Sequence, residues 1–196
     1  MSYYENLLGY KNTDGQVKMD DFVGFLQSLG ADRRPHRGRT LLEHLNGTKT
    51  LLAEWGCSEH VCAAGLFHSI YGTPRYQHVS LSLLQRDSLR ALIGEPAEQL
   101  VFLFSTCHRP QDLLSGALNW PNEVQFDMSN TERVVVNPRL FQDLVAIECA
   151  NIVDQTADEK LHHKFISYLS VILTVMSASF GQSVKSTIEY RLRLAQ

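Results

Sequence analysis

Residues 36–73 read HRGRTLLEHLNGTKTLLAEWGCSEHVCAAGLFHSIYGT, and the rest of the chain is organised around them. The spacing of apolar residues predicts two helices joined by a short turn. Thr40 and Glu43 have the spacing of a capping box, which predicts that the first helix begins at Thr40. His44 lies near the start of the first helix and His68 near the end of the second. We therefore expect the fold to bring the two histidines together, as half of a metal site or one wall of an active site.

Composition points to one globular domain. The chain has 196 residues, of which 44% are hydrophobic and 20% charged, enough for a sizeable core. A net charge of −3 gives no reason to expect nucleic-acid binding, and residues 165–180 are too short and polar for a membrane span. The four cysteines form no CxxC pair and the N-terminus lacks a signal peptide, so we expect free thiols in a cytoplasmic protein. The sequence is compatible with a monomer or a homo-oligomer.

The fold class expected from the whole chain is all-α, a helical bundle with a small inserted β-hairpin. Residues 107–123 look like a loop, and two β-prone runs around polar turn residues predict the hairpin at about 124–136. We expect a single domain over 1–196, with a helical N-terminal extension at 1–33 and a core at about 34–182. Helical spacing and end signals predict helices at 2–9, 19–29, 40–55, 58–71, 81–93, 96–106, 138–154 and 159–180.

The order of the histidines resembles the HD-domain superfamily, most closely the hydrolase domains that act on guanosine tetraphosphate alarmones. His36 precedes a glycine and His44, the segment AAGLFH ends at His68, and a later helix carries the dipeptide Ala150-Asn151. The resemblance covers about residues 34–155. It implies an HD-like bundle and metal-assisted hydrolysis of a small, phosphorylated metabolite or nucleotide. The chain departs from the family at two carboxylates, because the His-Asp pair is His68-Ser69 and the last aspartate is Asn151.

The expected metal centre is one divalent cation (Mn, Fe or Zn) held by His44, His68 and a substitute carboxylate. Glu148 and Asp154 each lie three residues from Asn151 on the same expected helix, so either can replace a lost aspartate. Water bound to such an ion becomes a nucleophile near neutral pH.

The other candidate residues lie around these ligands. His36, His68 and Tyr71 are the candidate catalytic residues, and His36 also offers a third imidazole. The candidate substrate-binding residues are arginines that can hold a phosphate, together with a helix-end histidine (followed by Arg109) and an amide: Arg37, Arg39, Arg75, His108 and Asn151.

Three interpretations stay open at this point. A single metal ion serves a hydrolase, or the site is metal-free and its histidines act in acid–base chemistry or ligand binding, or the protein is a degenerate HD domain that binds a partner. An atypical iron oxygenase of the same superfamily is a further alternative.

Overall fold

The computed structural model describes residues 19–127, 133–155, 168–172, 185–187 and 189–190. Its architecture is mainly α with small antiparallel strand pairs, which confirms the predicted fold class. The helices are α2 (Met19–Ser28), α3 (Leu41–Glu54), α4 (Glu59–Phe67), α5 (Arg86–Ile93), α6 (Glu95–Thr106), α7 (Gln111–Asn119) and α8 (Pro138–Gln155), with a short 3-10 turn η1 (Leu83–Gln85) before α5. None of these described helices has the length and apolar character needed to span a membrane.

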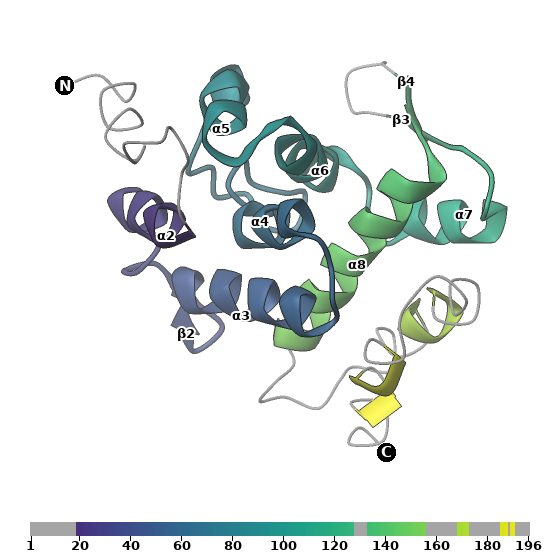
Figure 1. Ribbon diagram of the computed structural model, residues 1–196, viewed down its shortest axis with the longest axis horizontal. Helices are drawn as coiled ribbons and strands as arrows, with labels where there is room; N and C mark the ends of the chain where they lie inside the picture. The colour runs from purple at the N-terminus through teal and green to yellow at the C-terminus, as the bar shows by residue number, and fades with distance from the viewer. Residues whose placement is uncertain (1–18, 128–132, 156–167, 173–184, 188, 191–196) are drawn as a thin grey trace.

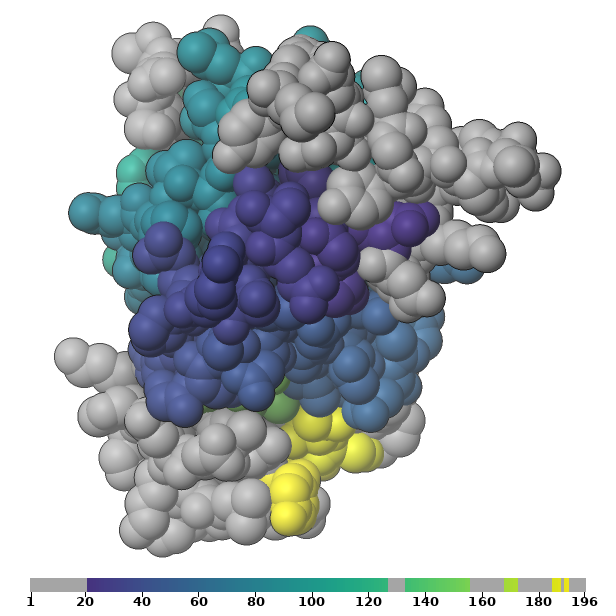
Figure 2. Space-filling model, turned by 90° about the vertical axis from the view of Figure 1, so that its left-hand side faces the viewer, coloured from purple at the N-terminus to yellow at the C-terminus, as the bar shows by residue number. Residues whose placement is uncertain are grey.

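Helix α4 occupies the centre of the bundle (Figure 1). It packs against α3 on one side and α6 on the other, while α8 crosses α3, α4 and α6. Figure 2 shows the face where α2 lies beside α3. Residues 61–67 of α4 are all buried, as are residues 143–154 of α8. Polar residues on these two helices therefore lie inside the protein, where each needs a partner.

Helix α3 begins as its sequence predicts. The Thr40 hydroxyl accepts a hydrogen bond from the backbone N–H of Glu43 at 3.2 Å, and the Glu43 carboxylate accepts one from the Thr40 N–H at 2.7 Å. These reciprocal bonds satisfy two donors of the first turn and fix its position. The position of His44 along α3 is therefore set by local sequence.

Two short strand pairs flank the helices. The predicted hairpin is confirmed: β3 (Val124–Asp127) pairs with β4 (Arg133–Val136), with Val124 opposite Val136. A second, unpredicted pair joins β1 (Pro35–His36) to β2 (Arg39–Thr40). Its turn is made by two residues with positive φ, Arg37 at 45° and Gly38 at 81°. Glycine adopts that conformation without strain, so the pair closes and delivers His36 to the start of α3.

Three predicted elements differ from the structure. Helix α4 ends at Phe67 and not near residue 71. After Phe67 the backbone hydrogen bonds join residues three apart, as in a turn, and Gly72 adopts a φ of 75°, which no α-helical residue has. The helix expected at 81–93 is divided between η1 and α5, and the loop expected at 107–123 contains α7. The helix expected at 2–9 lies outside the described residues, as does most of the one at 159–180, of which residues 168–172 are described and helical.

Candidate functional site

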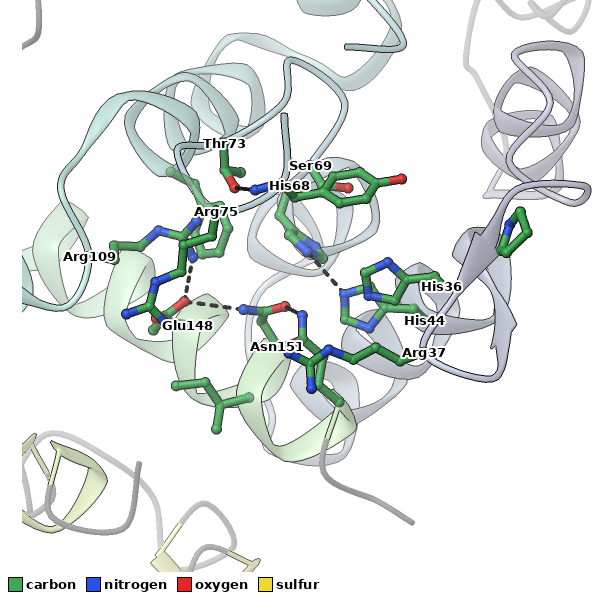
Figure 3. A pocket seen from close by; sticks show the side chains of 15 residues that line it. His36, Arg37, His44, His68, Ser69, Thr73, Arg75, Arg109, Glu148 and Asn151 are labelled. Atoms are coloured by element: carbon green, nitrogen blue, oxygen red, sulfur yellow. Dashed lines mark hydrogen bonds and ion pairs between the residues drawn. The ribbon is translucent and has the colours of Figure 1, made fainter. Parts of the chain in front are cut away.

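The fold brings His44 of α3 and His68, at the end of α4, into contact. Their Nε2 atoms lie 3.3 Å apart, and both side chains are almost fully buried. In Figure 3 a dashed line joins the nitrogen atoms through which the two rings meet, and the ring planes are nearly perpendicular, at 89°. The expectation that the helical hairpin joins the two histidines is met in the structure.

The outer nitrogens of both rings are held by acceptors. The Nδ1 of His68 lies 2.7 Å from the backbone carbonyl of Gly65, and the Nδ1 of His44 lies 2.5 Å from Oδ2 of Asp154. A carbonyl or carboxylate oxygen only accepts, so each Nδ1 carries a hydrogen. Burial, and then the charge of His44, hold the pKa of His68 well below its ordinary value. The Nε2 of His68 therefore presents a lone pair to His44.

Asp154 approaches His44 from α8, and neighbouring groups contact both of its carboxylate oxygens. Its Oδ2 also accepts a hydrogen bond from Nη2 of Arg39, which lies on β2. Its other oxygen packs against Gly47 so closely that a Cβ there would overlap Oδ1 and lie 2.8 Å from Cγ. Asp154 thus orients the His44 ring from behind, in the way that outer carboxylates orient metal-binding histidines.

His36 covers the other face of His44. The two rings stack with centroids 4.5 Å apart and planes 16° from parallel, and Tyr76 meets His36 edge-on at 5.4 Å. Burial, followed by the charge of His44, lowers the pKa of His36 from 6.5 to about 4. Its Nε2 is buried without a hydrogen-bond partner. His36 is thus a neutral ring beside the pair.

The opposite wall is a chain of polar side chains (Figure 3). Arg109 donates from Nη1 to Oε2 of Glu148 at 2.6 Å, and both side chains are buried. The amide of Asn151 donates to the same oxygen at 3.3 Å and accepts from Gln155 at 2.8 Å. The guanidinium of Arg109 also lies 3.7 Å above the ring of Phe104. The charge of Glu148 is therefore balanced by an arginine inside the protein.

These side chains enclose a cavity of about 350 Å³. Among the described residues of the lining, three carry a buried polar atom without a hydrogen-bond partner: the Nε2 of His36, the Oγ of Ser69 and the Nε of Arg109. Buried polar groups are nearly always paired, so unpaired ones around a cavity indicate a place for a polar ligand. The lining is made of Pro35, His36, Arg37, His44, His68, Ser69, Thr73, Arg75, Tyr76, Phe104, Arg109, Glu148, Asn151, Ile152 and Gln155.

The residues fit a metal ion only in part. Two ligand nitrogens at about 2.0–2.1 Å from a tetrahedral ion lie about 3.4 Å apart, close to the observed 3.3 Å between His44 and His68. Within the described residues, however, no group of three or more His, Cys, Asp or Glu side chains is arranged to hold a metal. The candidate carboxylates Glu148 and Asp154 are bound to Arg109 and Arg39 instead.

The structure gathers most of the predicted site residues. The predicted residues that line the cavity are His36, Arg37, His44, His68, Arg75, Glu148 and Asn151. Arg39 and Asp154 lie behind His44. Tyr71 and His108 do not line the cavity: Tyr71 donates to the buried Glu98 at 3.1 Å, and His108 is exposed.

Sequence reasoning did not select Arg109, Tyr76, Phe104 or Gln155. Gln155 follows Asn151 by four residues, a helical spacing that could have indicated the pair. No sequence signal indicates that Arg109, and not its neighbour His108, lines the cavity. This depends on how the end of α6 packs against α8.

Comparison with protein-family models gives a match over part of the chain. A family model described as a domain of unknown function (DUF6817) matches residues 25–109. This range contains His36, His44, His68 and Arg109 and stops before α8. No curated protein and no solved structure matches the chain at a significant level. The resemblance to HD domains therefore stays a prediction from the sequence.

Proposed function

We propose that the chain is an HD-like hydrolase for a small, phosphorylated metabolite, with one divalent cation held between His44 and His68. The observation that carries this proposal is the pair of inward-facing Nε2 atoms, 3.3 Å apart, whose rings are fixed from outside by Asp154 and Gly65. Imidazoles fixed through Nδ1 in this way are ready to bind a metal through Nε2. A divalent cation there would lower the pKa of a bound water molecule.

The charge of the cavity wall supports an anionic substrate. Arg37, Arg75 and Arg109 line the cavity, whereas Glu148 is the single carboxylate among the described residues of the lining. Glu148 is already paired with Arg109, and the neighbouring Asp154 is paired with Arg39. Guanidinium groups such as these bind phosphate through directed, charge-assisted hydrogen bonds.

A metal-free binding protein is the second candidate function. Ser69 and Asn151 are neutral at two positions where the resemblance implies carboxylates, and both line the cavity. Without a metal, a proton on the Nε2 of His44 bonds to the Nε2 of His68 and satisfies both rings. The cavity would then bind an anion without turnover.

The described cysteines support the proposed cytoplasmic location. Cys57, Cys62, Cys107 and Cys149 are all free thiols. Burial raises the pKa of Cys107 to about 12, which keeps this thiol protonated and unreactive. Free, buried thiols are typical of proteins in a reducing compartment.

Elemental analysis of protein purified without chelator tests the proposal. We expect about one divalent metal per chain, and loss of that metal in His44→Ala and His68→Ala. His108→Ala, at an exposed position outside the cavity, should keep it. The same four proteins are then assayed for phosphate release from nucleotides and phosphomonoesters with added Mn²⁺ or Fe²⁺. Absence of metal and turnover, with phosphate compounds still bound, would favour the second candidate.

A further inference from the structure

We infer that Arg109 and Ser69 form a phosphate-binding subsite of the cavity, in which one edge of the guanidinium and the serine hydroxyl hold phosphoryl oxygens without the help of a metal ion. For the class of its ligand the subsite rests on the proposed function, and it adds the residues that recognise the phosphate group. Both residues line the cavity. The Arg109 side chain is 5% exposed, and so is Ser69.

Arg109 is fixed in place with one edge of its guanidinium unused. Its Nη1 donates to Oε2 of Glu148 at 2.6 Å, and its Cζ lies 3.7 Å from the centre of the Phe104 ring. Its Nε is buried without a hydrogen-bond partner, and its Nη2 bonds to none of the residues that the structure describes. In a guanidinium the Nε–H and one N–H of Nη2 point the same way, as a pair that matches two oxygens of a phosphate. This edge is therefore available to a ligand.

Arg86 shows how this protein uses an arginine that only pairs with a carboxylate. It also lies over a phenylalanine ring and contacts a buried glutamate, but it is outside the described lining of the cavity. Its Nε donates to Oε1 of Glu98 at 2.6 Å and its Nη2 to Oε2 at 2.9 Å, so the carboxylate takes the whole side-on edge. Glu148 contacts Nη1 of Arg109 instead, and the corresponding edge of Arg109 is left without an acceptor.

Ser69 supplies a second buried donor. Ser28 and Ser105, at the ends of α2 and α6, each donate from Oγ to the backbone carbonyl three residues earlier, at 2.7 and 2.8 Å. The Oγ of Ser69 makes no such bond and is buried without a partner. A buried hydroxyl without an acceptor is unfavourable, so a ligand oxygen that accepts from Ser69 would stabilise this part of the wall.

Phe104 connects the two donors. The centroids of the Phe104 and His68 rings lie 5.0 Å apart, and Ser69 is the residue that follows His68. The Arg109 guanidinium lies over the same Phe104 ring, and Figure 3 shows Arg109 and Ser69 on neighbouring parts of the cavity wall. The oxygens of a phosphate point in several directions, so two can meet the Arg109 edge while a third meets Ser69.

The ligand group at this subsite must accept hydrogen bonds beside one carboxylate. The Nε–H of Arg109 can only donate, and a charge-assisted bond from a guanidinium favours an anionic oxygen over a water molecule or a carbonyl group. Glu148 contacts Nη1, which is the nitrogen outside the Nε–Nη2 edge. The guanidinium therefore stands between the carboxylate and the bound phosphate, and its positive charge offsets their repulsion.

Isothermal titration calorimetry tests the subsite on the full chain, freed of metal ions with EDTA and then desalted. We expect inorganic phosphate to bind to this protein although no divalent cation is present. Arg109→Lys keeps a positive charge for Glu148 but lacks the side-on edge, so phosphate affinity should fall about tenfold or more. Ser69→Ala removes one donor to a charged group, and it should weaken phosphate binding about tenfold.

Arg86→Lys is the matched control, because it makes the same change at an arginine that pairs with a buried glutamate outside the cavity. Its phosphate affinity should equal that of the unchanged protein. Unchanged affinity in Arg109→Lys, or equal losses in the two lysine variants, would overturn the subsite. Where Arg109→Lys fails to fold in circular dichroism, Ser69→Ala decides, and full phosphate affinity in that variant would refute the subsite.

The same titrations separate the subsite from the proposed hydrolase. Phosphate binding that appears only after Mn²⁺ is added would overturn the subsite and leave the proposed function standing. Phosphate binding to the metal-free protein that depends on both residues, with no metal binding and no turnover under any condition, would support the subsite and overturn the proposed function.

Discussion

Replacing Gly47 with alanine should destabilise the protein through Asp154. Gly47 lies inside α3, where alanine normally improves a helix by about 1 kcal/mol. Here the new methyl group would lie 2.8 Å from Cγ of Asp154 and overlap its Oδ1. Asp154 has little freedom to retreat, because its other oxygen is bound to His44 and Arg39 and its side chain is 6% exposed.

The net magnitude follows from two opposing effects. Overpacking of this kind costs about 1–3 kcal/mol, and losing a buried hydrogen bond to a charged group costs about 1.5–3 kcal/mol. The two costs together are about 2.5–6 kcal/mol. Subtracting the helix-propensity gain of about 1 kcal/mol leaves a net loss of about 1.5–5 kcal/mol for Gly47→Ala. In an Asp154→Ala background the obstacle is absent, so the same substitution should stabilise the protein by up to about 1 kcal/mol.

The change of sign is measured by a double-mutant cycle with urea unfolding followed by circular dichroism. Gly116→Ala is the control, because its methyl group would meet Phe141, about 20 Å along α8 from Asp154 at 1.5 Å per residue. Its effect should be the same in both backgrounds. If Gly47→Ala stabilises the protein in both backgrounds, Asp154 does not press on residue 47 and the argument that it fixes His44 fails.

Three further predictions test the neighbouring groups. The pKa of His36 is lowered from 6.5 to about 4 and that of His68 lies well below its ordinary value, so below pH 6.5 the unfolded chain binds more protons than the folded one. The free energy of unfolding should therefore fall from pH 6.5 towards pH 4, by up to about 1.4 kcal/mol per pH unit for each histidine, and urea titrations of His36→Gln and His68→Gln should show a shallower fall. Tyr71→Phe removes one hydrogen bond outside the cavity, so it should lower the free energy of unfolding in urea by about 1 kcal/mol. Phosphate affinity measured by calorimetry should stay unchanged. A large loss of affinity would show that Tyr71 does belong to the ligand site. Arg109→Gln leaves Glu148 buried without its cation, so stability should fall by about 3–5 kcal/mol in the same unfolding assay and calorimetry should show weaker phosphate binding; unchanged binding would remove Arg109 from the ligand site.

The parts of the fold that sequence predicted are those set by local signals. The capping box at Thr40 and Glu43 places the start of α3, and the predicted and observed bounds of α8 agree within one residue. Helix α7 was missed because residues 107–123 as a whole resemble a loop, and Gly116 lies among them. In the structure a Cβ at that position would lie 3.1 Å or less from three atoms of the Phe141 ring. The glycine permits close packing of α7 on α8, and this contact is invisible in the sequence of α7 alone.

In the site, too, local signals predicted part of the arrangement and long-range contacts decided the rest. The contact between His44 and His68 was predictable, because the two residues lie at opposite ends of one helical hairpin. The partner of each acidic residue was not predictable from helical spacing. Asp154 meets Arg39 across 115 positions of the chain, and Glu148 meets Arg109 across 39. Because of these long-range pairs, Asp154 orients His44 and Glu148 balances the charge of Arg109. Helical spacing on α8 alone cannot reveal these roles.

The same pairs explain why the cavity can lack carboxylates at Ser69 and Asn151 and still hold two facing imidazoles. Two lone pairs 3.3 Å apart repel each other, so a proton or a cation must lie between the Nε2 atoms of His44 and His68. Asp154, behind His44, compensates the positive charge of either one. A metal ion at this position would therefore compete with a proton for the same two nitrogen atoms.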